Sequence, residues 1–189
     1  MASYLTPVEK PHGLMLKLGY WYTKRQFGQV PGPLSVFCAR MPTAFTSFYG
    51  KVGKLDGKLT LPTELVMLVR EQVARTNGCE FCIDSNRWAA LNKGGISAEK
   101  LDALGEFATS TQFSSAERTA LSFVTEVAAG KHSSAEMIQE LTQHFSERQI
   151  CELVWLVASE HLYNVNNIAL NIGAAGMCAT APTRVPAAA

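Results

Sequence analysis

Two cysteines with C-x-x-C spacing, Cys79 and Cys82, are the residues of this 189-residue chain whose types and spacing best suit chemistry. They follow Asn77-Gly78, and glycine readily adopts the left-handed conformation that ends a helix. We therefore expect a new helix to open at Cys79, with the two thiols one turn apart on one face and close enough to bridge. The unpaired backbone N–H groups of a first helical turn favour a thiolate over a thiol. Such a pair suits reversible thiol–disulfide chemistry.

Two other uses of the pair remain open. A C-x-x-C is also half of many zinc sites, but the second half should be another such pair or two closely spaced histidines. The remaining candidate ligands are isolated from one another along the chain: Cys38, Cys151, Cys178, His12, His132, His144 and His161. The two cysteines could also pack as small apolar residues, although packing alone does not require a helix to end directly before them.

The segment around the pair resembles a known family. Asn-Gly-Cys-Glu-Phe-Cys-Ile-Asp-Ser, followed by Lys-Gly-Gly-Ile-Ser at 93–97, is similar to the core motif of the alkylhydroperoxidase D-like branch of the carboxymuconolactone decarboxylase superfamily. Pro31-Gly32-Pro33, Arg40-Met41-Pro42 and the segments 115–118 and 145–150 extend the resemblance to roughly residues 30–172. It implies a helical bundle in which Cys82 attacks a peroxide or disulfide and Cys79 resolves the product.

The family's proton relay is altered in this chain. The family has a glutamate twelve residues before the first cysteine and a histidine four residues after the second, where this sequence has Met67 and Asn86. Neither side chain exchanges a proton near neutral pH, so we expect weakened peroxidase activity. Restoring histidine at 86, and glutamate at 67 as well, is expected to raise the rate. Glu71, expected to be an exposed helical carboxylate, is our candidate substitute for the missing acid.

The longest predicted helix, from Ser146 to about Ile172, carries a polar stripe. Its members share one face at spacings of four, three and four residues: Glu160, Asn164, Asn167 and Asn171. A solvated face would explain the stripe. Burial among apolar neighbours would instead require a hydrogen-bond partner for each group, and Glu160 or His161 would then line the cysteine pocket.

Composition indicates one globular domain over residues 1–189, with 1–10 as an N-terminal extension and 183–189 as a disordered tail. Hydrophobic residues make up 47% of the chain, and its net charge of +1 offers no broad field for nucleic acid or membrane lipid. Five scattered cysteines, no signal-peptide pattern and no apolar run long enough to span a bilayer favour the cytoplasm.

An all-α fold of about eight helices is expected, since no alternating run of β-branched residues with turn signals appears. Helix starts are marked by capping boxes at Ser114-x-x-Glu117, Ser133-x-x-Glu136 and Ser146-x-x-Gln149, and by Ser97. The helix Leu14–Phe27 is apolar on more than one side. We therefore place it in a subunit interface, and the resemblance implies trimers or hexamers.

Three functions follow from these observations. The leading one is a thiol-dependent peroxidase or thiol–disulfide oxidoreductase that uses the Cys79/Cys82 pair, with a hydroperoxide or disulfide substrate. The resemblance implies no bound metal or organic cofactor and an unknown dithiol reductant protein. The alternatives are a non-catalytic redox sensor or interaction subunit, and lactone decarboxylation, which in the superfamily does not depend on a C-x-x-C pair.

Overall fold

The structure is a computed structural model that describes residues 2–180, apart from the side chains of Phe45, Phe48, Ala179 and Thr180. Its secondary structure is helical throughout, with no strand among those residues, which confirms the all-α prediction. The predicted tail at 183–189 lies outside the described residues. Nine α-helices occur in the described part of the chain: α1 (Leu14–Phe27), α2 (Gly50–Asp56), α3 (Thr63–Asn77), α4 (Glu80–Ala89), α5 (Ala98–Asp102), α6 (Ser115–Ala128), α7 (Ala135–Thr142), α8 (Glu147–Ala169) and α9 (Met177–Thr180). Short π-helical turns at Pro33–Cys38, Ala44–Tyr49 and Ala90–Gly94 and a 3₁₀ turn at Ala103–Glu106 connect them.

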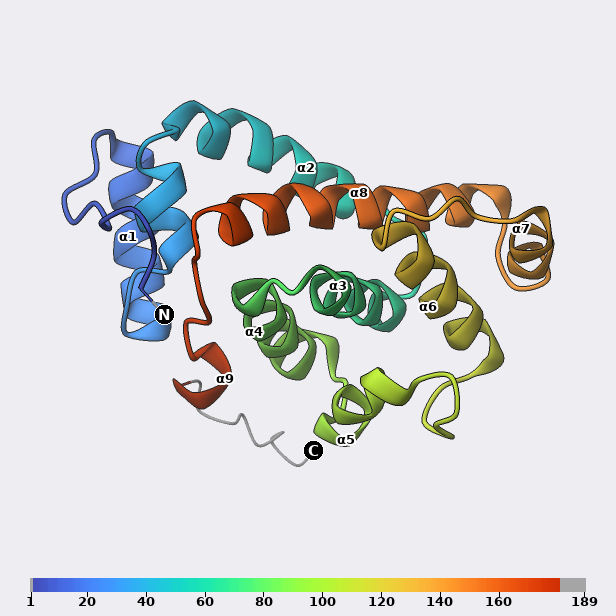
Figure 1. Cartoon of the computed structure of the whole chain (residues 1–189). Coiled ribbons are helices and arrows are strands. Elements are labelled where there is room, and N and C mark those ends of the chain that lie inside the picture. The colour runs from blue at the N-terminus through green and yellow to red at the C-terminus, as the bar shows by residue number, and fades with distance from the viewer. Residues whose placement is uncertain (1, 181–189) are drawn as a thin grey trace.

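Helix α3 lies at the centre of the bundle and packs against α8, α6 and α4 (Figure 1). Its buried side is mainly apolar and closely covered, with Leu68, Val69 and Val73 at zero exposure. These side chains join the largest hydrophobic cluster, which takes Leu121 and Val124 from α6 as well as residues of α8. The central helix is therefore fixed by its neighbours, and so is the chain that leaves its end toward the cysteines.

Helix starts follow the capping signals of the sequence in all but one case. Ser114 with Glu117 and Ser146 with Gln149 form complete capping boxes, in which each partner binds the other's backbone N–H. The third box is wrong by one residue, because α7 is capped by Ser134, whose hydroxyl accepts a hydrogen bond from the backbone N–H of Met137. Two adjacent serines gave the pattern two possible starts.

The two ends of the described part of the chain are fastened to the bundle by hydrogen bonds. The N-terminal extension is held by backbone hydrogen bonds from Tyr4 to Leu170 and from Val8 to Ser35, each about as long as a helical bond at 3.0 and 2.9 Å. At the other end, the Asp84 carboxylate of α4 accepts backbone N–H groups of the α9 region, including Met177 at 2.9 Å. In Figure 1 α9 accordingly lies beside α4.

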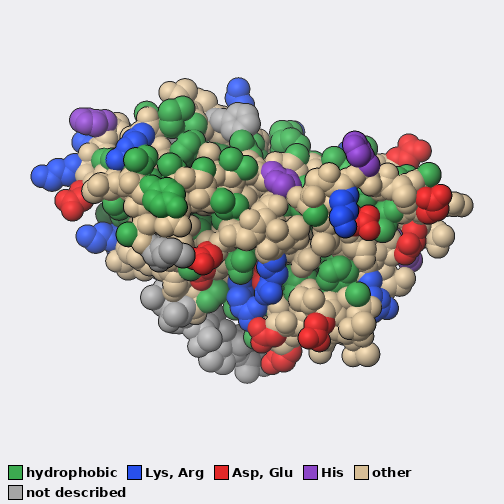
Figure 2. All heavy atoms as spheres, in the orientation of Figure 1, with side chains coloured by type: hydrophobic (Ala, Val, Ile, Leu, Met, Phe, Trp, Pro, Cys, Tyr) green, Lys and Arg blue, Asp and Glu red, His purple; other side chains and the backbone are tan. Residues whose placement is uncertain are grey.

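Helix α1 buries one side and exposes the other. Leu16 and Tyr20 face a small second core formed with Leu34 and Cys38. The opposite side leaves five large apolar side chains between 51% and 73% exposed: Leu14, Met15, Leu18, Trp21 and Tyr22. Hydrophobic side chains also cover much of the α1 end of the face shown in Figure 2. Between residues 2 and 180, no helix combines the length and apolar character needed to cross a membrane.

Candidate active site

The C-x-x-C pair lies at the start of α4, where the sequence places it. Gly78 ends α3 in the left-handed conformation, with φ 70° and ψ 28°. Cys79 is the N-cap of α4, and its sulfur accepts a hydrogen bond from the backbone N–H of Cys82 at 3.3 Å. The two cysteines form a disulfide, with Cα atoms 5.2 Å apart. Both residues are almost completely buried. The helix start thus supplies the backbone dipoles that favour a thiolate once the bond is reduced.

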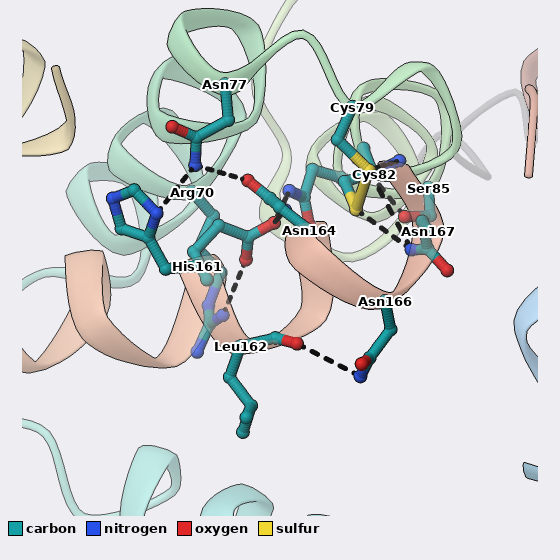
Figure 3. Close-up of a disulfide and its surroundings, with 12 residues drawn as sticks. Arg70, Asn77, Cys79, Cys82, Ser85, His161, Leu162, Asn164, Asn166 and Asn167 are labelled. Carbon is teal, nitrogen blue, oxygen red and sulfur yellow. Dashed lines mark hydrogen bonds and ion pairs between the residues drawn. A yellow bond between two sulfur atoms is a disulfide. The ribbon is translucent and has the colours of Figure 1, made fainter. Parts of the chain in front are cut away.

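Asn167 of α8 is the polar side chain nearest to the two sulfurs. Its amide Nδ2 donates to the Cys82 sulfur at 3.2 Å and lies 3.8 Å from the Cys79 sulfur (Figure 3). Asn167 is itself only 4% exposed. Its Oδ1 is buried and has no hydrogen-bond partner within the described part of the chain. An N–H donor at this place stabilises a sulfur anion more than a thiol, which favours ionised Cys82 after reduction.

The two cysteines line different cavities. Cys82 lines a large one of about 560 Å³, and Cys79 lines a small one of about 130 Å³. Asn167 is the one residue that lines both. Most of the surface of the larger cavity is apolar, and seven of its lining residues are aromatic, aliphatic or proline: Pro31, Pro33, Leu34, Phe37, Tyr49, Phe81 and Tyr163. A ligand would therefore reach each sulfur from a different side of Asn167.

Charge in the larger cavity is concentrated in a cluster around Arg70. The guanidinium pairs with Asp56 at 2.7 Å and with Glu160 at 3.0 Å. Glu160 is 2% exposed, and its second oxygen accepts hydrogen bonds from Asn86 and Asn164 at 3.0 and 2.9 Å. Burial raises the pKa of the Glu160 carboxyl, against the opposing effects of Arg70 and these hydrogen bonds. A carboxyl group able to hold a proton thus lines the same cavity as Cys82.

Asn86 connects this carboxyl group to the helix of the cysteines. It lies one turn after Cys82 on α4, lines the same cavity, and donates to Glu160 from α8. Met67 does not face this arrangement, because its thioether packs directly on Gly94 and against the main core. Met67 is partly buried and is not among the residues that line the larger cavity, so the further rate increase expected from a glutamate at 67 stays a prediction. The acid near Asn86 comes from α8 instead.

Glu71 differs from its predicted setting. It is fully buried rather than exposed, and its carboxylate binds Arg75 of the same helix at 2.7 Å, with Arg87 at 3.9 Å. Burial raises its pKa, and the two arginines oppose that effect. Glu71 is not among the residues that line either cavity beside the disulfide. Both arginines contact its Oε1, while its Oε2 is buried with no hydrogen-bond partner among the described residues. The cavity acid is Glu160.

His161 also lies outside both cavities. Its Nδ1 is 3.3 Å from the Nδ2 of Asn77, which donates to Asn164 at 2.7 Å (Figure 3). Two amides therefore separate the imidazole from Glu160, and amides hydrogen-bond without exchanging protons near neutral pH. The sequence named Glu160 or His161 as a residue of the cysteine pocket. The structure brings Glu160 to the cavity that Cys82 lines and leaves His161 at the far end of the hydrogen-bond chain through Asn77 and Asn164.

The polar stripe of the last helix is buried rather than solvated. Asn164 is fully buried and Asn167 nearly so, and each finds partners in the elements packed on α8. Asn171 falls after the helix, at φ 52°, and binds the Ala2 carbonyl oxygen instead. The predicted helix end at about Ile172 is thus three residues too late, since α8 ends at Ala169.

A third thiol that the sequence did not single out lines the larger cavity. Cys38, on the π-helical turn Pro33–Cys38, is 6% exposed and free. Burial raises its pKa to about 11. It therefore stays protonated near neutral pH, in contrast to a cysteine at a helix start. Across the described residues there is no group of three or more His, Cys, Asp or Glu side chains that could hold a metal ion.

Comparison with known proteins places this site in a family. Residues 39–126, which include both cysteines, match the model of the carboxymuconolactone decarboxylase family. The matched segment is a little under half of the chain. A curated relative, the uncharacterized protein YnjA of Escherichia coli K12, is 29% identical over 168 residues, covering 87% of this chain and 91% of its own. The resemblance drawn from the motif around Cys79 and Cys82 is thereby confirmed.

Several solved structures have a similar fold. The debrominase Bmp8 has a TM-score of 0.78 and 25% identity, over 94% of this chain and 95% of its own. A cysteine-to-alanine variant of Bmp8 has also been solved in complex with 2,3,4-tribromopyrrole. An Agrobacterium tumefaciens protein of unknown function, titled a putative antioxidant defence protein AhpD, matches with a TM-score of 0.67 at 18% identity, over 74% of this chain and 95% of its own. The fold is therefore of the alkylhydroperoxidase D-like type.

Proposed function

We propose that this protein is a dithiol-dependent reductase in which Cys82 attacks an electrophilic atom of a small, mainly apolar substrate and Cys79 then closes the disulfide. The observation that carries this proposal is the arrangement around Cys82: a sulfur at a helix start, beside an N–H donor, on the wall of a cavity of about 560 Å³. A cavity of that size and apolar lining is typical of small-molecule sites. An organic hydroperoxide is the first candidate substrate.

The reaction with a hydroperoxide uses groups already placed in the cavity. The Cys82 thiolate attacks the terminal peroxide oxygen, the O–O bond breaks, and the departing alkoxide takes a proton to give an alcohol. Cys82 is then a sulfenic acid, which the Cys79 thiolate attacks, forming the disulfide and expelling hydroxide, which takes a proton from solvent to become water. A dithiol reductant restores both thiols by exchange. The peroxide gains the two electrons that the thiol pair loses.

Glu160 is the group suited to supply the alkoxide's proton. It lines the cavity with Cys82, and burial raises the pKa of its carboxyl, so more of it is protonated near neutral pH than of an ordinary glutamate. Asn86 orients one oxygen by its hydrogen bond. Because position 86 is asparagine, no imidazole passes protons between Glu160 and the Cys82 thiol. We therefore expect the reaction with peroxide to be slow.

Reductive dehalogenation of a halogenated aromatic ring is the second candidate. The observation that favours it is the aromatic wall of the cavity, where the rings of Tyr49 and Tyr163 stack at 5.2 Å between centroids, in a chain similar over most of its length to a debrominase. Flat rings stack well against such surfaces. The overall reaction would replace the carbon–halogen bond by carbon–hydrogen, release halide, and oxidise the Cys79/Cys82 pair.

A paired turnover assay separates these functions. The purified protein is supplied with excess dithiothreitol and either cumene hydroperoxide or a brominated pyrrole, and the alcohol or bromide released is measured over many equivalents. Cys82→Ala is the control for uncatalysed reaction with the dithiol. Steady release with one substrate, lost in Cys82→Ala, would identify the reaction class. A single turnover with no steady release from either would instead favour the redox sensor.

A further inference from the structure

We propose that the dithiol reductant engages the disulfide at Cys79 through the small cavity of about 130 Å³, on the other side of Asn167 from the substrate cavity. The inference rests on the redox cycle of the proposed function but concerns its other half, in which the disulfide is reduced. It assigns the two cavities different ligands: an apolar oxidising substrate at Cys82 and a thiol at Cys79.

The small cavity is open to a ligand and aimed at one sulfur. It is formed by the turn that joins α3 to α4, through Gly78 and Cys79, and by the end of α8 with the chain that follows it. Ile168 of α8 is 46% exposed and lines this cavity, so it marks the outer edge. None of its lining residues except Asn167 belongs to the substrate cavity. A ligand there would meet Cys79 without displacing one beside Cys82.

A second feature of this cavity points to a polar ligand group. The Oδ1 of Asn167, a residue that lines this cavity, is buried and has no partner in residues 2–180, although Nδ2 of the same amide donates to the Cys82 sulfur. Buried amide oxygens are usually hydrogen-bonded, so an unpartnered one beside a cavity invites a donor. The S–H or O–H group of a bound thiol reductant would satisfy it.

The direction of attack decides which sulfur leaves. A thiolate displaces one sulfur of a disulfide along the line of the S–S bond, so attack on Cys79 from its own cavity expels Cys82. The S–S bond breaks, a mixed disulfide forms between the donor and Cys79, and the electron pair goes to Cys82. The second thiol of the donor then attacks the donor sulfur in the mixed disulfide, releasing Cys79 as a thiolate and the donor as a cyclic or linked disulfide.

This order delivers the reactive thiolate to the substrate side. Cys82 leaves next to Asn167 Nδ2, in the first turn of α4, and faces the larger cavity. Attack from the substrate cavity would have the opposite result, because Cys82 would be held in the mixed disulfide and Cys79 would be released. The nucleophile would then be blocked, and the donor would occupy the space that the substrate needs.

The volume of the small cavity limits what can enter it. A water molecule takes about 30 Å³ in the liquid, so 130 Å³ holds roughly four or five non-hydrogen atoms. That is enough for a thiol and a short carbon chain. The ligand class is therefore a dithiol whose sulfur is carried on a slender, unbranched arm, with the rest of the donor outside.

Trapping the first exchange step in the wild-type protein tests the proposal directly. The oxidised protein is mixed with 2-mercaptoethanol, an unbranched thiol, quenched within milliseconds to seconds with N-ethylmaleimide, and digested with trypsin, which releases Thr76–Arg87 with both cysteines. Fragmentation of this peptide locates each group. We expect the 2-mercaptoethanol adduct on Cys79 and maleimide on Cys82. A majority of adducts on Cys82 would overturn the proposal.

Two substitutions on α8 test the route of entry. Ile168→Trp narrows the small cavity, and Val165→Trp is the matched control, since Val165 is an exposed residue of the same helix that lines neither cavity. We expect reduction of the disulfide by dithiothreitol to slow at least tenfold in Ile168→Trp and by less than twofold in Val165→Trp. Equal rates in folded Ile168→Trp and wild type would reject the small cavity as the entrance.

These measurements are independent of the substrate. Reduction is followed without any oxidant, as the mass gained when both thiols react with N-ethylmaleimide. Failure to turn over hydroperoxide or bromopyrrole would therefore refute the proposed function and leave the site of reduction measurable. Adducts mainly on Cys82, or an unchanged rate of disulfide reduction in Ile168→Trp, would refute the present inference. Turnover of the substrate by the wild type could continue in that case, so the two failures are distinguishable.

Discussion

Replacing Glu160 by glutamine is the change that most directly tests the role given to the buried carboxyl. Glutamine keeps the size of the side chain, and its oxygen can still accept from Asn86 and Asn164, which bind the same carboxylate oxygen. The amide nitrogen takes the place of the oxygen that pairs with Arg70. Arg70 keeps its 2.7 Å contact with Asp56, so the guanidinium is not left alone. The variant thus removes the proton and the hydrogen bond from Arg70, and it keeps the two hydrogen bonds from Asn86 and Asn164.

The expected loss of rate follows from general acid catalysis. A positioned acid contributes on the order of 100- to 10,000-fold. We expect about 100-fold here, at the lower end, because Asn86 cannot carry protons between Glu160 and the Cys82 thiol. The loss should appear in the second-order rate constant for oxidation of the reduced thiols by cumene hydroperoxide near pH 7. Reduction of the disulfide by dithiothreitol should change little.

The same variant should change how stability depends on pH. Burial raises the pKa of Glu160 above its ordinary value of 4.5, so the folded state holds this proton when the unfolded state has lost it. Stability from this group is therefore fully present below about pH 4.5 and is lost as pH rises through the folded pKa, by at most about 1.4 kcal/mol per pH unit. Glu160→Gln should lack this decline.

The assay compares wild type, Glu160→Gln and Glu71→Gln, with folding checked by circular dichroism. Glu71 is the matched comparison, because it is also buried and paired with arginine but lines neither cavity. We expect less than a threefold loss of oxidation rate there. If Glu160→Gln reacted as fast as wild type while Glu71→Gln did not, the assignment of the cavity acid would be refuted.

Three further outcomes are expected. Asn86→His should raise the oxidation rate of the thiols by roughly tenfold or more, because an imidazole next to Glu160 can accept and return a proton; an unchanged second-order rate constant at pH 7 would contradict this. Cys79→Ser should leave Cys82 as a sulfenic acid that reacts with dimedone after one equivalent of peroxide, whereas Cys82→Ser should give no such adduct. Trp21→Glu, on the exposed side of α1, should dissociate an oligomer that light scattering detects for wild type at micromolar concentration; a monomeric wild type would remove the interface.

Several parts of this protein are determined by short stretches of sequence. The bounds predicted for the helix Leu14–Phe27 are those of α1, and Gly78 ends α3 immediately before the cysteines. The serines at 114 and 146 cap their helices as the pattern indicates. Each of these features depends on residues within one or two turns of each other, since capping and helix termination are local hydrogen-bonding problems. The position of the C-x-x-C pair at a helix start is likewise determined by nearby residues.

The partners of the disulfide depend on tertiary structure instead. Glu160 and Asn167 reach the cysteine helix from α8, 74 residues away from Asn86 and 85 from Cys82. The sequence indicated that α8 carries a polar stripe, but a solvated stripe and a buried one have the same spacing. Packing of α8 on α3 and α4 buried the stripe, brought Glu160 to the cavity and left His161 outside it.

The two sides of the disulfide are the clearest case of what packing alone decided. The spacing in the sequence puts Cys79 and Cys82 on one helical face, and the family resemblance alone gave them different roles. They differ in the structure because Asn167 lies between a large apolar cavity at Cys82 and a small one at Cys79. Cavities are spaces that several elements leave between them, and no single segment encodes one. The sequence therefore determined the redox pair, and the tertiary structure assigned each sulfur its surroundings.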